Sequence, residues 1–386
     1  MLYHTFYKQK RKTMITTTDT LFLQQAMKIA EKGAGRVNPN PLVGAVIVRE
    51  GTILAEGYHT RYGSLHAERE AFADADRRKI SCEGATIYVT LEPCCHHGKQ
   101  PPCTEAIIEH KVSRVVVGLT DPNPVVAGHG LDILREAGIE VEVLDTGSPL
   151  VKELMFRNRV FLKYITKNIP WITMKYAMTL DGKICTASGE SKWITGEQSR
   201  AHVHLLRRNH MAIVCGIGTV LADNPMLDTR IPSEPDARNP IRIILDSSLR
   251  TPLSSRIALT AKEIRTIIVH SKQASEEKKE ALRCLGIELW EHESITEMAL
   301  HAAREKIDSM LVEGGGTINE AFVKEGLVDE VWAFIAPKIV GGERAKTPVE
   351  GTGIEHLSAA LCFSISDVHT FGEDVCIHGI VRKENT

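Results

Sequence analysis

The first readable pattern along the chain is an amphipathic helix over residues 20–31. Apolar side chains recur there at the spacing of one helix face, and two glycines follow shortly after it. Two short apolar runs come next, at 42–48 and 52–58, with a Glu-Gly pair between them. Apolar runs joined by so short a turn are typical of a β-hairpin. We therefore expect the chain to begin with a helix and two strands.

Helical and strand patterns alternate after the hairpin. Helices are expected at 66–76, 104–110 and 130–137, and strands at 85–90, 114–119 and 139–144. Such alternation predicts a sheet with helices on both of its faces, the α/β class. The amphipathic segment 151–167 follows and is expected to connect this part of the chain to the next.

A second alternating series begins at Trp171. Its expected strands lie at 171–177, 211–216, 241–246, 264–269, 309–313, 330–336 and 374–381, with helices such as 197–208 and 274–285 between them. This series is long enough to enclose a hydrophobic core of its own. The whole pattern predicts a first α/β domain at 19–147 and a second at 148–386.

Residues 1–18 precede the first domain and differ from it in composition. The segment contains four basic side chains and no acidic one, and so short a charge run is usually just solvated. We expect a disordered tail, with Met14 as an alternative initiator. A targeting or nucleic-acid-binding tail is the competing interpretation.

Composition is that of an ordinary globular protein, with 43% hydrophobic and 25% charged residues among 386. Lys+Arg number 47 and Asp+Glu 49, so no basic excess favours nucleic acid or an anionic membrane as a partner. No apolar run reaches the roughly 18 residues of a membrane span, and the N-terminus lacks the apolar core of a secretory signal. We expect a cytoplasmic protein whose nine cysteines are thiols or metal ligands.

Three of the cysteines lie close together in a segment that could bind a metal. The segment 92–103 contains Cys94, Cys95 and Cys103, and a His-Ala-Glu triplet begins upstream at His66. A catalytic zinc ion takes three protein ligands and leaves one position open for water. One imidazole and two thiolates meet that number, and a helix N-terminus, where the cysteines are expected, favours the thiolate.

Glu68 follows the histidine by two residues and can lie beside the open metal position. From there a carboxylate can take a proton from water activated by zinc and deliver it to a leaving amine, which amounts to hydrolytic deamination. Zinc deaminases carry this arrangement as H-x-E and P-C-x-x-C. Here, however, eight residues separate Cys94 from Cys103. Competing candidates for ligands are Cys95, His96 and His97.

Two other interpretations of this segment stay open at this point. One is a cysteine-rich loop without metal. The other is a closed structural zinc site, which needs a fourth ligand from the same loop and leaves Glu68 without a role.

Four segments of the second domain combine glycines and polar residues. They are 175–183, 188–195, 216–225 and 312–319. The glycines 314–316 lie where a strand meets a helix, and backbone N–H groups there can approach phosphate, although this signal is weak by itself. Arg207 and Arg230 are candidates for binding a phosphate monoester, with solvated surface arginines as the alternative.

Five short segments of the first domain together resemble a known family. They are 90–94, 97–99, 101–103, 121–124 and 126–128. The set resembles the deaminase half of the bifunctional riboflavin biosynthesis deaminase–reductases, and the four segments of the second domain resemble the reductase half. The resemblance implies a cytidine-deaminase-like three-layer α/β domain followed by a dihydrofolate-reductase-like domain. It also implies Zn2+ and NADPH as cofactors.

The same resemblance assigns roles to residues of the first domain. The implied zinc ligands are His66, Cys94 and Cys103. Glu68 is the implied proton carrier. The implied substrate contacts are Asn40, His59, His96 and Lys99.

The second domain receives two sets of implied contacts. Those with NADPH are Ala177, Trp193, Thr219, Asp223, Ser247, Gly315, Gly316 and Thr317. Those with the substrate are Ser191, Arg207, Leu227, Arg230 and Glu313. Lys175 is added because it and Glu313 are the polar residues that could handle a proton.

The function that the resemblance implies is a two-step conversion in riboflavin biosynthesis. The first domain would hydrolyse an amino group of 2,5-diamino-6-(5-phosphoribosylamino)pyrimidin-4(3H)-one, and the second would reduce the ribosyl group to ribityl phosphate with NADPH. One alternative is a nucleic-acid-editing deaminase with an accessory domain, against which the charge balance argues. Another is a zinc module without enzymatic activity beside a nucleotide-binding domain. We expect a homo-oligomer that acts on a small molecule.

Overall fold

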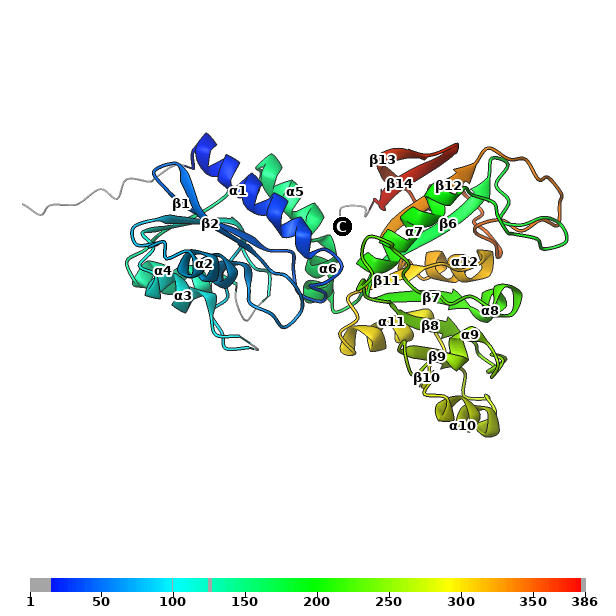
Figure 1. Ribbon diagram of the computed structural model, residues 1–386. Helices are drawn as coiled ribbons and strands as arrows, with labels where there is room; N and C mark the ends of the chain where they lie inside the picture. Colours follow the sequence, from blue (N-terminus) through cyan, green and yellow to red (C-terminus); the bar gives the residue numbers. More distant parts are fainter. Residues whose placement is uncertain (1–14, 99, 124–126, 383–386) are drawn as a thin grey trace, which may run out of the picture. The chain divides into compact units, whose positions relative to one another are not determined.

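A computed structural model of the chain describes residues 15–98, 100–123 and 127–382. The chain forms two compact units that divide between Leu162 and Lys163. Each unit has its own sheet and its own hydrophobic core (Figure 1). Among the described residues, no helix is both long and apolar enough to cross a membrane.

A five-stranded mixed sheet forms the centre of the first unit, in the order β2-β1-β3-β4-β5. Its strands are β1 (Gly44–Arg49), β2 (Thr52–Tyr58), β3 (Thr86–Leu91), β4 (Arg114–Leu119) and β5 (Glu140–Val143). β1 is antiparallel to both β2 and β3, whereas β3, β4 and β5 are parallel to one another. All five strands lie within a few residues of the ranges that the hydrophobic pattern predicts.

Helices cover both faces of this sheet, which gives three layers (Figure 1). On one face lie α1 (Thr17–Ala30) and α5 (Pro149–Arg157). On the other lie α2 (Ala67–Arg77), α3 (Cys103–Glu109) and α4 (His129–Glu136). The buried faces of β1, β3 and β4 pack against this second group in one apolar cluster. The predicted layered α/β architecture is therefore confirmed.

The first helix begins inside the segment 1–18 that we expected to be disordered. Thr16 caps it, because the Asp19 backbone N–H donates to Thr16 Oγ1 over 3.1 Å and the Asp19 carboxylate accepts from Thr16 N over 2.8 Å. Asp19 is also buried, and it accepts hydrogen bonds from Arg114 and from the Tyr88 hydroxyl. The prediction is thus wrong for residues 15–18, while 1–14 lie outside the described residues.

The expected connecting segment 151–167 is broken into two helices at Asn158. α5 ends at Arg157, and α6 (Arg159–Lys167) begins immediately after Asn158. Leu154 of α5 is buried over Gly118 of β4, so α5 belongs to the first unit. For this reason the two units divide later in the chain than the sequence pattern suggests.

The second unit contains a nine-stranded sheet in the order β10-β9-β8-β7-β11-β6-β12-β14-β13. Its strands are β6 (Trp171–Thr179), β7 (Ala212–Gly216), β8 (Ile241–Leu245), β9 (Thr266–His270), β10 (Glu288–Glu291), β11 (Ser309–Val312), β12 (Glu330–Ala336), β13 (Phe363–Phe371) and β14 (Asp374–Val381). The strands from β10 to β12 are parallel, and β14 and β13 are antiparallel additions at one edge. The hydrophobic pattern predicts neither β10 nor β13.

Alternate side chains of the central strands enter two different cores. Ala212 and Val214 of β7 pack toward α11 (Ile295–Arg304) and α12 (Gly316–Lys324). Ile213 and Cys215 face the opposite side, which is covered by helices that include α8 (Ile217–Asp223), α9 (Arg256–Leu259) and α10 (Glu276–Cys284). α7 (Glu197–Asn209) packs on that same side, over β11 and β12. The sheet is therefore buried on both faces, as its near-continuous apolar strands predict.

Candidate active sites

His66, Cys94 and Cys103 come together in the first unit, although they lie in three separate segments. His66 caps the N-terminus of α2, Cys94 lies in the connection after β3, and Cys103 is the first residue of α3. Their ligand atoms all lie within 4.8 Å of one another. His66 Nδ1 is 3.4 Å from Cys94 Sγ and 3.5 Å from Cys103 Sγ.

These separations fit one tetrahedral metal ion. Zinc bonds of about 2.1 Å to nitrogen and about 2.3 Å to sulfur place two such ligands about 3.6 Å apart. The Cys103 backbone N–H donates to Cys94 Sγ over 3.4 Å. Hydrogen bonds from Cys103 and His66 lower the pKa of the Cys94 thiol to about 4, which favours the metal-binding thiolate. The donor set therefore fits zinc.

Arg69 explains how the long loop between the two cysteines can be accommodated. Its guanidinium donates to the backbone oxygens of Pro101 (3.0 Å) and Pro102 (2.7 Å), just before Cys103. Arg69 lies on α2, one turn from His66. The helix that presents the histidine thus also holds the chain that presents the second thiol.

Glu68 lies in the first turn of α2 and is only 2% exposed. Its carboxylate is hydrogen-bonded to the Cys103 thiol. Burial raises the pKa of Glu68 to about 7. A buried carboxyl group beside the candidate metal ligands can both accept and donate a proton near neutral pH.

Asn40 and His59 form a second polar pair in the same unit. Asn40 Nδ2 is 3.1 Å from His59 Nε2, and His59 Nδ1 is 2.9 Å from the backbone oxygen of Leu65. The His59 and His66 rings meet edge to face, with centroids 5.4 Å apart. Burial lowers the pKa of His59, so the ring is neutral, donates from Nδ1 and accepts from Asn40. The structure therefore connects Asn40 to the residue before the candidate metal ligand His66.

His96 is exposed on the connection after β3, two residues beyond Cys94. Lys99 lies outside the described residues. Cys95 is half-buried and does not join the cluster of candidate ligands, and His97 instead faces Glu105 at 3.3 Å.

Glu92 is a residue of this site that the sequence does not single out. Its buried carboxylate accepts backbone N–H groups from Asp121 (3.2 Å), Gly128 (3.0 Å) and Gly130 (3.1 Å). A Cβ on Gly130 would meet the Pro93 oxygen at 2.3 Å, so α4 begins directly against the turn that carries Cys94. Only its place beside Pro-Cys could have indicated such a role.

The expected reductase residues of the second unit gather at the carboxyl ends of its parallel strands. Glu313 directly follows β11, Ser247 lies just after β8, and α8 with Thr219 and Asp223 follows β7. In open α/β sheets this edge is the usual place for ligands. Ala177 lies on the neighbouring strand β6.

Lys175, Arg207 and Glu313 form a largely buried ionic cluster, with side chains 11–15% exposed. The Arg207 guanidinium donates to both Glu313 oxygens over 2.7 and 3.0 Å, and Lys175 Nζ is 3.7 Å from Glu313. Burial alone would raise the pKa of Glu313, but Arg207 and Lys175 lower it to about 2. Burial also lowers the pKa of Lys175. Arg207, at 13% exposure, is therefore not a solvated surface arginine.

Leu227 and Arg230 lie on the segment after α8. Leu227 is buried, and the Asp228 backbone oxygen accepts from Arg207 over 3.1 Å. The Arg230 side chain is 66% exposed and lies 3.3 Å from the Asp228 carboxylate. The exposed guanidinium borders an open pocket between residues 229 and 235.

Gly315 caps α12, and Gly316 is its first residue. A Cβ on Gly316 would collide with the Thr347 oxygen at 2.6 Å, whereas a Cβ on Gly315 would meet nothing within 4 Å. Close packing therefore explains Gly316, while the backbone at Gly315 is open to a ligand, which fits the approach of a dinucleotide phosphate. Thr317 is exposed beside it.

Trp193 and Ser191 lie in the loop after β6, and the Trp193 side chain is 64% exposed. Lys192 Nζ contacts the Asp223 carboxylate at 3.0 Å, which joins this loop to the end of α8. Lys338 Nζ donates to the backbone oxygens of Trp193 (2.8 Å) and Ile194 (2.7 Å).

Comparison with known proteins explains why these two sites occur in one chain. Residues 16–119 match the model of the cytidine and deoxycytidylate deaminase zinc-binding region, and residues 170–377 match the RibD C-terminal domain. The riboflavin biosynthesis protein RibD of Actinobacillus pleuropneumoniae is 44% identical over 372 residues, 95% of this chain and 96% of that protein. The chain belongs to the RibD family.

Solved RibD structures have the same architecture. Acinetobacter baumannii RibD, 34% identical, superposes with a TM-score of 0.84 over 95% of this chain and 99% of its own. The diaminohydroxyphosphoribosylaminopyrimidine deaminase/5-amino-6-(5-phosphoribosylamino)uracil reductase of Thermotoga maritima is 36% identical, with a TM-score of 0.83 and coverages of 95% and 99%.

Membership of the RibD family confirms the expected function and architecture. The protein is a bifunctional deaminase and reductase of riboflavin biosynthesis, with a cytidine-deaminase-like unit and a dihydrofolate-reductase-like unit. It uses zinc in the first unit and NADPH in the second. The alternative of a nucleic-acid-editing deaminase is not favoured.

Proposed function

We propose that the first unit removes an amino group from 2,5-diamino-6-(5-phosphoribosylamino)pyrimidin-4(3H)-one at the cluster of His66, Cys94 and Cys103. The observation that carries this proposal is the cluster itself, with a buried carboxylate against one of its thiols. The deaminase activity that gives the Thermotoga maritima relative its name supports the choice of substrate.

In this proposal the three clustered side chains bind zinc and Glu68 moves the proton. Zinc bound there supplies the Lewis acidity that brings the pKa of water to about 7. Glu68 takes a proton from the attacking water and delivers it to the amino group, which leaves as ammonia while the ring carbon becomes a carbonyl. Asn40 and the neutral His59 orient the pyrimidine, and His96 and Lys99 contact the substrate from the loop after β3.

For the second unit we propose that NADPH lies along the carboxyl edge of the parallel strands. NADPH supplies the hydride that reduces C1′ of the ring-opened ribose imine. Lys175 Nζ, held by Glu313, supplies the proton that the imine nitrogen takes up. The proposed cofactor contacts are Ala177, Trp193, Thr219, Asp223, Ser247, Gly315, Gly316 and Thr317.

Substrate binding in this unit is divided among residues with different surroundings. Arg207 already donates to Glu313 and to the Asp228 backbone, so we assign it to holding Glu313 in place. The exposed Arg230 is the better candidate for the substrate phosphate. Ser191 and Leu227 are the remaining proposed contacts.

Coupled turnover tests both halves together. With the diaminopyrimidine ribotide as the only substrate and zinc present, we expect NADPH oxidation, measured by its near-ultraviolet absorbance, together with ammonia release. Ammonia without NADPH oxidation would contradict the reductase assignment. If a folded, zinc-loaded protein gave neither ammonia release nor NADPH oxidation, that result would contradict the deaminase assignment.

Lys338→Met is expected to raise the KM for NADPH about fivefold, with little change in deamination. The substitution removes the two hydrogen bonds that hold the backbone of Trp193 and Ile194, and a net loss of about 1 kcal/mol corresponds to that factor. Steady-state kinetics on the deaminated intermediate measures the effect. Lys324→Met, at an exposed position of α12, is the control. An unchanged KM for NADPH would contradict the assignment of Trp193 to the cofactor site.

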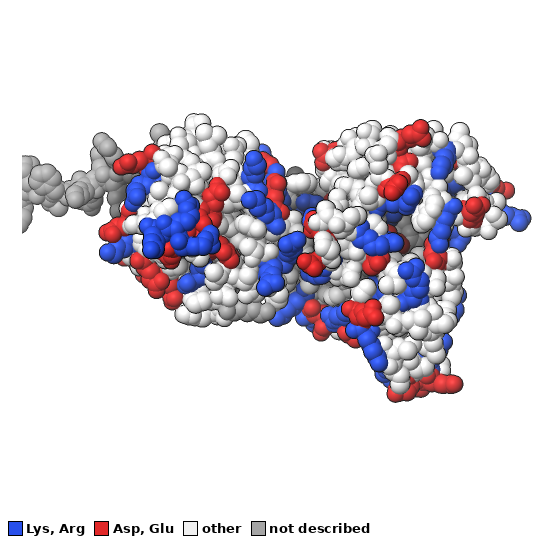
Figure 2. All heavy atoms as spheres, viewed as in Figure 1, with Lys and Arg blue, Asp and Glu red and all other residues white. Residues whose placement is uncertain are grey.

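We further propose a cytoplasmic homo-oligomer that does not bind nucleic acid. Ile365 and Val368 on the edge strand β13 are 64% and 61% exposed, which supports contact with a second copy. Basic and acidic side chains are interspersed over the visible face in Figure 2, which argues against a nucleic-acid surface. A single-chain mass in light scattering would contradict the oligomer.

A further inference from the structure

Asn158 lies between α5 and α6 and is only 3% exposed. Its side-chain amide pairs with the main chain of Leu42, 116 residues earlier in the sequence. The Leu42 N–H donates to Asn158 Oδ1 over 2.8 Å, and Asn158 Nδ2 donates to the Leu42 oxygen over 3.1 Å. One amide thus satisfies both backbone groups of a residue outside the sheet, as a neighbouring strand would.

Leu42 lies two residues before β1, which begins at Gly44, and two residues after Asn40. Pro41, between them, has no N–H to donate and a fixed φ. The Asn40 N–H turns back to the Val37 oxygen over 2.9 Å. The direction in which Asn40 enters the site therefore depends on where the Leu42 backbone lies, and Asn158 determines that.

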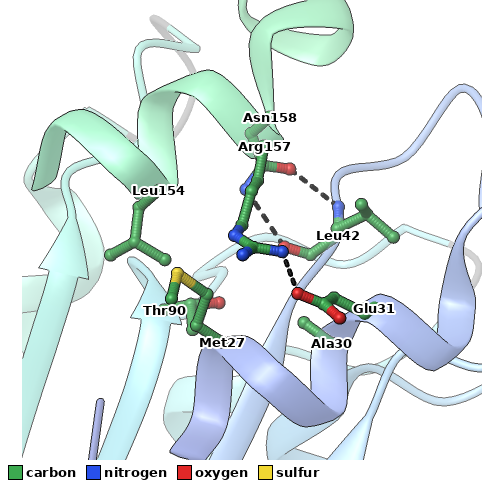
Figure 3. Close-up of a pocket in the computed structure, with 8 residues that line it drawn as sticks. All are labelled: Met27, Ala30, Glu31, Leu42, Thr90, Leu154, Arg157 and Asn158. Carbon is green, nitrogen blue, oxygen red and sulfur yellow. Dashed lines mark hydrogen bonds and ion pairs between the residues drawn. The ribbon is translucent and has the colours of Figure 1, made fainter. Parts of the chain in front are cut away.

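Asn158 itself is held firmly by its surroundings. Its own N–H donates to the Leu154 oxygen over 3.0 Å, and Leu154 is 1% exposed over β4. Figure 3 shows the amide of Asn158 reaching Leu42, while the adjacent Arg157 turns to pair with Glu31. Met27 and Leu154 line the small pocket beside this amide. The amide is therefore a fixed reference for the Leu42 backbone.

From Leu42 the contacts continue into the site. Asn40 Nδ2 is 3.1 Å from His59 Nε2, and His59 Nδ1 is 2.9 Å from the oxygen of Leu65, which precedes His66. We propose that Asn158 is a positioning residue of the deaminase, which sets the place of Asn40 through the Leu42 backbone. The inference rests on the proposed function, because it takes Asn40 as a substrate contact.

The test uses Asn158→Leu in the full chain. The substitution introduces an apolar side chain of similar size and removes both hydrogen bonds to Leu42. We expect the KM for the ribotide in ammonia release to rise about tenfold, the change that a loss of about 1.4 kcal/mol produces. The kcat should change less than threefold. Zinc content per chain and NADPH-dependent reduction of the deaminated intermediate should stay at the wild-type level.

Two further variants separate positioning from general destabilisation. Arg157→Gln, at the adjacent residue, loses only the surface ion pairs with Glu31 and Glu153 and should leave the KM unchanged. Asn158→Asp keeps the acceptor for the Leu42 N–H but loses the donor to its oxygen, and should give a smaller rise in KM. If Asn158→Leu does not fold, the KM of the Asn158→Asp variant provides the test. Loss of zinc together with activity, or a KM that does not change, would overturn the inference.

A double variant distinguishes failure of this inference from failure of the proposed function. If Asn158 acts through Asn40, adding Asn158→Leu to Asn40→Ala should raise the KM no further than Asn40→Ala alone. If the two substitutions instead raised the KM by independent factors that multiply in the double variant, the inference would be overturned, while Asn40 would remain a substrate contact. An Asn40→Ala variant with a wild-type KM would instead contradict the proposed role of Asn40, and with it the route through Leu42.

Discussion

Glu68→Gln is expected to lower ammonia release about 10²- to 10⁴-fold, the usual contribution of a positioned general acid–base. The glutamine has the same shape but cannot take a proton from water and pass it on. Its neighbours need not move, because the candidate metal ligands are His66, Cys94 and Cys103. Ammonia is measured with the ribotide as substrate, and zinc content is measured on the same samples.

The second activity serves as an internal control for this variant. Reduction of the deaminated intermediate by NADPH should remain at the wild-type rate, because it takes place in the other compact unit. Glu70→Gln, in the same first turn of α2, should leave both activities unchanged. If Glu68→Gln released ammonia normally, the carboxylate would not be the proton carrier. A joint fall of both activities in folded protein would show that the sites are not independent.

Glu313→Gln should abolish reduction and destabilise the second unit by about 3–5 kcal/mol, the cost of breaking a buried ion pair. The variant leaves the largely buried cations of Arg207 and Lys175 beside a neutral amide. All four tryptophans of the chain lie after residue 163, so tryptophan fluorescence follows unfolding of this unit alone. Urea unfolding monitored in this way measures the loss of stability.

The pH dependence of stability provides a second measurement on Glu313. Its pKa falls from 4.5 to about 2 on folding, so the ionised group stabilises the fold fully above about pH 4.5. That contribution, about 3 kcal/mol, should be lost as the pH falls from 4.5 toward 2. Glu313→Gln should lack this part of the pH dependence. Equal acid sensitivity of the two proteins, or a variant as stable as wild type, would refute the role of the cluster.

The sequence predicts most elements of both sheets because their strands are short apolar runs bounded by turns. β13 escapes prediction because five consecutive residues within it, from Ser364 to Val368, are exposed, and its sequence therefore looks like a loop. The break between α5 and α6 at Asn158 is not predicted either, since the amphipathic pattern continues through it. Hydrophobic periodicity reports which residues are buried, and these two features do not depend on burial.

The residues of the candidate sites likewise include some that the sequence indicates and some that it does not. The H-x-E and P-C motifs suffice to indicate His66, Glu68 and Cys94 as neighbours, because their spacing reflects the chemistry of a metal site. Glu92 and Asn158 are not indicated, because each acts on backbone groups of a distant segment. Backbone groups are the same in every residue, so a sequence holds no sign of such a partner.

The strand order of the second unit has a consequence for how the protein is made. β6 lies between β11 and β12, and β11 is synthesised about 130 residues after β6 ends. At about 5–20 residues per second, this first strand waits many seconds on the ribosome with both edges unpaired. The first unit is complete by Leu162 and can fold during that time. Newly made chains are therefore exposed to aggregation through the unpaired edges of β6 until β11 and β12 have been synthesised.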